Sequence, residues 1–103
     1  MRQVSIFDSA TPSNALMDFV YREAENMWDT AEHRKRSIAQ VQSFARFSDN
    51  SSRPLSQFLP RDIHDWRDAL VEGGVSKSTA NRYLASVSKV FNHAVYERVI
   101  QSA

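Results

Sequence analysis

Apolar residues recur every three or four positions along most of this chain, and strict alternation of apolar and polar residues is rare. This spacing gathers apolar side chains on one face of an α-helix, so it predicts an all-α fold. Four helices are expected, over about 13–28, 32–47, 60–72 and 77–97. The expected core stripes are Leu16, Phe19, Val20, Ala24 and Met27; Ile38, Val41, Phe44 and Ala45; Ile63, Trp66, Ala69 and Leu70; and Ala80, Leu84, Val87, Phe91, Ala94 and Val95.

Capping and turn-forming residues mark the expected helix ends. Ser13 suits the N-cap of the first helix, and Pro60 suits the first turn of the third, where its missing N–H needs no partner. The Gly73-Gly74 pair predicts a helix stop, and Ser76 should cap the fourth helix. These helices with short links predict a small bundle.

The length of 103 residues fits one domain, which we expect over 13–103 after a flexible segment over 1–12. "SDNSSRP" should break the chain after the second helix. The connector "LSQFLP" then follows, and should place Leu55 and Phe58 in the core. Trp28 and Trp66 are also expected to be core anchors rather than ligand platforms.

Cysteine is absent from the sequence, which excludes a disulfide scaffold, a zinc knuckle and a thiol nucleophile. No apolar run reaches the length of a signal peptide or a membrane-spanning helix. The expected location is therefore the cytoplasm, with no membrane partner.

The net charge is only +1, but charge is unevenly distributed along the chain. Residues 8–32 hold six acidic and one basic side chain, and residues 59–72 hold four acidic and two basic. Residues 33–58 hold five basic and one acidic, and residues 73–103 four basic and one acidic. If the second and fourth helices share one side of the bundle, that side is positive and favours a polyanion. Scattered solubilising charge is the alternative.

The outward side of the fourth helix strengthens the polyanion hypothesis, because small hydrogen-bonding residues alternate there with long cations. Such a surface lets a helix approach a groove while Lys and Arg reach phosphates, and Asn or Arg can read base edges. In the second helix, "HRKRS" sets cations on the first turn, against the helix dipole, which suggests an external anion. The candidate DNA-binding residues are Arg34, Lys35, Arg36, Gln42, Ser43, Arg46, Lys77, Ser78, Thr79, Asn81, Arg82 and Lys89.

The sequence has no complete motif for phosphate binding, metal binding or catalysis. "KST" at 77–79 lacks the preceding glycine and strand of a phosphate-binding P-loop. His64 and Asp68 share a helical face, but no third metal ligand of suitable type is close in sequence, so acidic surface is the better interpretation. No nucleophile–base pair can be assembled. We expect no catalytic residue, cofactor, metal or small-molecule substrate.

The segment "GVSKSTANRYLASVSKVFNHAVYERVI" resembles the last helix of the core-binding, SAM-like N-terminal domain of tyrosine recombinases, the phage integrase family. "PLSQFLPRDIHDWRDAL" looks like the preceding family segment, and "AEHRKRSIAQVQSFARF" is similar to the second helix. Leu59 departs from the Thr or Ser that the family usually has before the proline. The resemblance covers about 13–100. The matching residues are Leu55, Pro60, Ile63, Thr79, Asn81, Arg82, Leu84, Val87, Phe91, Ala94 and Ile100.

The resemblance implies a bundle of four or five helices that clamps one side of double-stranded DNA with its second and fourth helices. Neighbouring recombinase protomers would be further partners. Strand cleavage would belong to a separate C-terminal catalytic domain, so this chain would be a non-catalytic fragment of bacterial or phage origin. The leading hypothesis is thus a DNA-binding module, and the alternative is a protein–protein interaction module that uses the acidic first helix.

Overall fold

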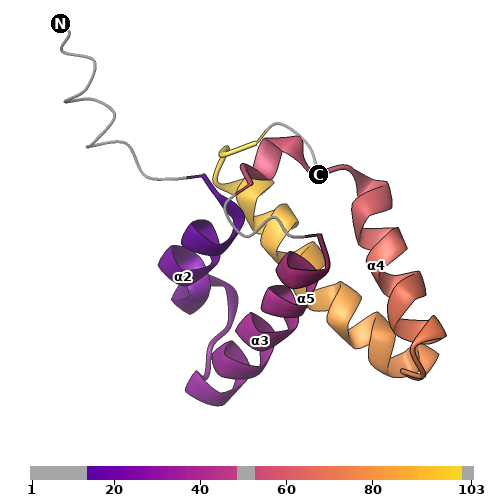
Figure 1. The fold of residues 1–103 in the computed structure, drawn as a ribbon. Helices are drawn as coiled ribbons and strands as arrows, with labels where there is room; N and C mark the ends of the chain where they lie inside the picture. The colour runs from indigo at the N-terminus through magenta and orange to yellow at the C-terminus, as the bar shows by residue number, and fades with distance from the viewer. Residues whose placement is uncertain (1–13, 49–52, 101–103) are drawn as a thin grey trace, which may run out of the picture.

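A computed structural model describes residues 14–48 and 53–100, so the expected flexible segment 1–12 lies outside the described residues. Within those ranges the fold is all-helical and has no strand, as the periodicity predicts (Figure 1). The elements are α2 (Leu16–Met27), α3 (Ala31–Ser48), the 3₁₀ turn η1 (Leu55–Gln57), α4 (Pro60–Glu72) and α5 (Lys77–Tyr96). No helix in the described part of the chain is long and apolar enough to cross a membrane.

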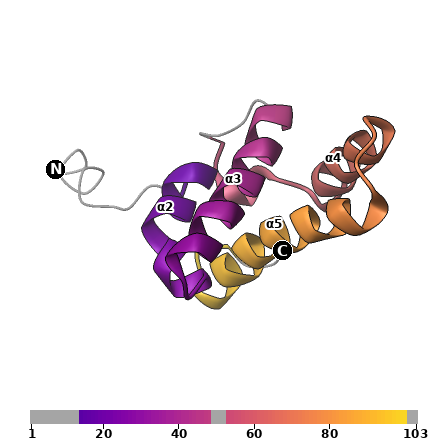
Figure 2. The same cartoon turned by 90° about the horizontal axis from the view of Figure 1, so that it is seen from below.

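The longest helix, α5, connects the two ends of the bundle (Figures 1 and 2). Its first half contacts α4, where the rings of Tyr83 and Trp66 stack with centroids 6.1 Å apart. Its second half contacts α2, where the rings of His93 and Phe19 lie 5.9 Å apart. Helix α3 packs against α5, α2 and α4. The arrangement therefore brings the second and fourth predicted helices together.

An aromatic chain forms the middle of the core. The Phe44 ring of α3 lies 5.3 Å from Trp66 of α4 and 5.5 Å from Phe58, which in turn lies 5.6 Å from Phe91 of α5. Leu55 of η1 is fully buried beside them, so the connector enters the core as predicted. Several of the expected stripe residues are only half-buried: Ile38, Ile63, Ala69, Leu70, Leu84 and Val95.

The predicted start of the first helix near residue 13 is wrong by about three residues, because Ala15 is extended and α2 begins at Leu16. Ser13 itself lies outside the described residues. Ala15 forms an antiparallel bridge with Pro54. The Leu16 N–H donates to the Arg53 carbonyl at 3.0 Å, and the Leu55 N–H donates to the Asn14 carbonyl at 2.9 Å. These bonds satisfy backbone groups that a longer helix would use, so α2 begins at Leu16 without a side-chain cap.

The other predicted helix ends agree with the structure. The Ser76 hydroxyl accepts from the Thr79 N–H at 3.2 Å and caps α5. Gly74 has a φ of 103°, which glycine adopts without steric cost, and it lets the Val75 N–H return to the Leu70 carbonyl. The Leu59 side chain has no polar atom with which to cap α4. The Leu59 N–H nevertheless has a partner, because it donates to the Asp62 carboxylate at 2.8 Å.

Candidate nucleic-acid interface

A groove of about 640 Å³ runs between α3 and α5, and three of the predicted DNA-binding cations line it. Arg36 comes from α3, whereas Arg82 and Lys89 come from α5. The groove lies where α3 packs against α5, and residues of both helices line it. Its walls and floor are formed by Met27, Trp28, His33, Arg36, Ser37, Gln40, Thr79, Arg82, Tyr83, Ala85, Ser86 and Lys89.

The charge of this groove is not neutralised within the described part of the chain. Arg36, Arg82 and Lys89 are exposed, and none of them forms an ion pair with a described residue. No described Asp or Glu lines the groove either. Three like charges on facing helices repel one another, so an external anion at this place would lower their electrostatic energy.

Polar side chains cross the floor of the groove between the cations. The Ser86 hydroxyl of α5 donates a hydrogen bond to Oε1 of Gln40 on α3. Thr79 lies at the same groove near the start of α5, and its hydroxyl accepts from Ser76 at 3.0 Å. Hydroxyl and amide groups beside Lys and Arg are the usual donors to phosphate and sugar oxygens. The groove therefore suits a sugar–phosphate backbone in both charge and hydrogen bonding.

Arg34 and Lys35 do not join Arg36 in the groove. Both lie in a hollow between α2 and α3, together with Gln42, which donates to the Tyr21 hydroxyl. The Arg34 guanidinium donates to the Trp28 carbonyl at 3.0 Å, directly after the end of α2. A cation is stabilised at that helix end, so Arg34 has a structural use and needs no external anion. The prediction of an external anion from the helix dipole is therefore wrong for Arg34.

The remaining predicted residues are spread over other faces. Ser43 and Arg46 line a hollow between α3 and α4. Oδ1 of Asn81 accepts from Nε of Arg67 on α4 at 2.9 Å, so this amide is already engaged within the chain. Lys77 and Ser78 are exposed on the first turn of α5, outside the groove lining. Of the twelve predicted residues, the groove gathers Arg36, Thr79, Arg82 and Lys89.

Gln40 and Tyr83 line the groove although the sequence did not single them out. Gln40 follows Arg36 by four residues and so shares its helical face, which is the signal that could have identified it. Tyr83 is next to Arg82 and stacks on Trp66, so its position depends on the packing of α4. No sequence pattern gives that contact.

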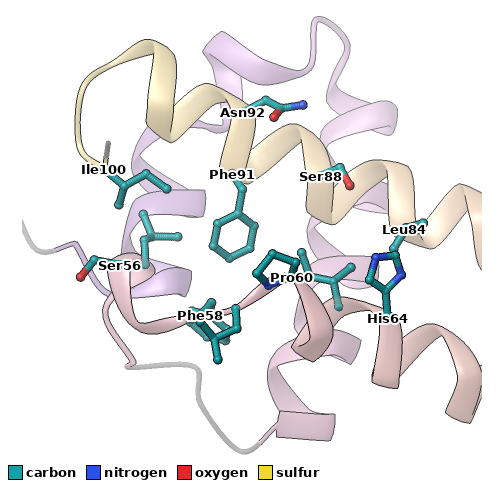
Figure 3. A pocket seen from close by; sticks show the side chains of 12 residues that line it. Ser56, Phe58, Pro60, His64, Leu84, Ser88, Phe91, Asn92 and Ile100 are labelled. Carbon is teal, nitrogen blue, oxygen red and sulfur yellow. The ribbon is translucent and has the colours of Figure 1, made fainter. Parts of the chain in front are cut away.

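A further hollow, of about 240 Å³, lies on another face of α5 and is mostly apolar. Figure 3 shows Phe91 pointing from α5 towards Phe58 and Pro60, with Ser88 and Asn92 on the same helix. Its described lining holds no Lys, Arg, Asp or Glu, and His64 is its one titratable group. This surface does not suit a polyanion.

Comparisons of the chain with models of protein families, with curated proteins and with solved structures find no match.

Proposed function

We propose that this chain binds duplex DNA through the groove between α3 and α5. The observation that carries the proposal is the convergence of Arg36, Arg82 and Lys89 on one groove without an acidic partner in the described residues. A phosphate backbone lying across both helices would contact cations on either side. Binding would then be driven largely by release of the counterions that DNA holds, and it would be sensitive to salt.

The resemblance of residues 55–100 to the core-binding domain of tyrosine recombinases supports the same function. In that family the second and fourth helices face the DNA, and they correspond to α3 and α5. We therefore propose the finer assignment as well: a SAM-like core-binding domain that forms one half of a recombinase clamp, has no catalytic role itself, and contacts neighbouring protomers.

The salt dependence of DNA affinity tests the proposed interface. Each phosphate contact contributes about 0.9 to the slope of log affinity against log salt concentration. Arg36→Ala and Lys89→Ala should each flatten that slope by about one unit and weaken binding to unrelated duplex sequences alike. Fluorescence anisotropy with a labelled duplex, between about 50 and 200 mM salt, measures both quantities.

Lys35→Ala and Arg46→Ala are matched controls, because each removes one exposed positive charge from α3 outside the groove. The proposal expects both to change the slope by clearly less than Arg36→Ala does. Equal effects of Arg36→Ala and Lys35→Ala would show that net charge alone drives binding, and would overturn the assignment of the groove.

A protein–protein interaction module is the second candidate function, and the surface of α2 favours it. Asp18, Tyr21 and Glu25 are exposed and lie at a spacing that places them on one side of the helix. Tyr21 is 55% exposed, and a partly exposed tyrosine among carboxylates suits a basic protein surface. This candidate takes precedence if neither Arg36→Ala nor Lys89→Ala affects DNA binding.

A further inference from the structure

Three potential metal ligands meet where α2 packs against the end of α5. Glu23 comes from α2, and His93 and Glu97 come from the last turn and the C-cap of α5. Their ligand atoms all lie within 4.8 Å of one another. His93 and Glu97 are four residues apart, so α5 presents both side chains on one face. The cluster is separate from the groove between α3 and α5.

The ligand atoms of Glu23 and His93 are spaced almost as a small divalent ion requires. Nε2 of His93 lies 2.9 Å from Oε1 of Glu23. A tetrahedral Zn²⁺ with bonds of about 2.0–2.2 Å holds its ligand atoms roughly 3.4 Å apart, so opening this pair by a few tenths of an ångström admits the ion. Glu97 is exposed, and its carboxylate oxygen lies within 4.8 Å of the other two ligand atoms.

The imidazole and the first carboxylate are held in place before any ion binds. The His93 ring lies between Phe19, at 5.9 Å, and Tyr96, which stacks on it at 6.1 Å. Its side chain is 12% exposed, and that of Glu23 is 15% exposed. Glu23 also accepts from Asn26 at 3.1 Å, an outer hydrogen bond of the kind that orients carboxylate ligands. A ligand pair with little freedom loses little entropy on binding.

The cluster combines one imidazole nitrogen with two carboxylates, and one cation lies beside it. Arg22 lies 3.9 Å from Oε2 of Glu23, so it competes with a cation and limits the affinity. Nitrogen and oxygen ligands together suit Zn²⁺ and similar transition metals better than Mg²⁺ or Ca²⁺.

We propose that Glu23, His93 and Glu97 form a site for a divalent transition-metal ion of the Zn²⁺ type, which cross-links α2 to the end of α5. Three protein ligands leave the fourth position of the ion to water. Because the ion binds only when both helices are packed, it stabilises the folded state.

Titration of the full chain with Zn²⁺ alone tests this site, by isothermal calorimetry and by thermal unfolding. The expected result is one bound ion and a Tm that rises with Zn²⁺ concentration. Glu97→Gln is the decisive variant, because Glu97 is exposed and takes no part in the hydrogen bond between Glu23 and His93. This variant should lower the affinity for Zn²⁺ at least tenfold, while its Tm without metal stays near that of the parent chain. His93→Gln should abolish binding.

His33→Gln and His64→Gln are the controls. Nδ1 of His33 lies 3.8 Å from the Asp29 carboxylate, so these two residues offer two metal ligands, but no third ligand joins them among the described residues. His64 lies at the apolar hollow. Both variants should bind Zn²⁺ like the parent chain. Unchanged affinity in Glu97→Gln, or loss of binding in His33→Gln, would overturn the proposal by showing a different or non-specific site.

Discussion

Three consecutive cations have different surroundings in this protein. Arg34 donates to the carbonyl at the end of α2, Lys35 lies beside it in the hollow between α2 and α3, and Arg36 lines the groove with α5. The reason is the helix itself, since each residue is rotated by about 100° from the one before it. A run of positive residues on a helix therefore cannot act as one patch.

At the residue scale, acidification should weaken the contact between α2 and α5 through Glu23. Its pKa lies below the ordinary value of 4.5, so the ionised carboxylate stabilises the fold above that pH. This contribution is lost as the pH falls from about 4.5 through the lowered pKa. Urea unfolding between pH 7 and pH 3 should show a decline in the free energy of unfolding that is shallower in Glu23→Gln. Glu25 is exposed on the same helix, so the free energy of unfolding of Glu25→Gln should depend on pH as that of the parent chain does.

At the scale of elements, the helix ends differ in how far local sequence defines them. The start of α5 depends on Ser76, which lies directly before it and bonds to its first turn. The start of α2 depends on Arg53 and Leu55, about forty residues later in the chain, because their backbone groups pair with those of Leu16 and Asn14. A local pattern can predict the first kind of boundary but has no information about the second.

The cap of α5 gives a prediction for stability. Ser76→Ala removes the oxygen that accepts from the Thr79 N–H, and should cost about 1 kcal/mol in the free energy of unfolding. Ser78→Ala is the matched control, because the Ser78 side chain is exposed and reaches only the Ser76 hydroxyl, at 3.5 Å. Urea unfolding of both variants measures the difference, and a loss as large in Ser78→Ala would exclude the cap as the cause.

At the scale of the whole molecule, the groove exists because α3 packs against the middle of α5 while α2 and α4 take the two ends. The aromatic chain from Phe44 through Phe58 to Phe91 and Trp66 holds α3, α4, α5 and the connector together. Arg36, Arg82 and Lys89 extend from the helices that this core holds in place, and they form no ion pair with acidic groups of the described chain. Core packing therefore sets the spacing of the candidate interface.

Truncation of a phenylalanine on α3 tests this dependence. Phe44 is fully buried, and Phe44→Ala should cost about 3–5 kcal/mol through lost burial and the remaining cavity. Phe47, on the same helix, is 50% exposed, and Phe47→Ala should stay within about 0.5 kcal/mol. Chemical unfolding measures both. Similar losses at the two positions would mean that α3 does not pack against the core in this register.

The sequence by itself determined the helical class, the approximate extent of α3, α4 and α5, and most of the core, because apolar period, proline, glycine and a capping serine all act within a few residues. It also identified the cationic character of α3 and α5. Only the tertiary structure decided that Arg36 faces Arg82 and Lys89, and that Arg34 and Asn81 bond within the chain instead. Likewise, Glu23 and His93 meet although seventy residues separate them. Which face of one helix meets which face of another depends on how large side chains fit together across the whole core, and no local spacing records that fit.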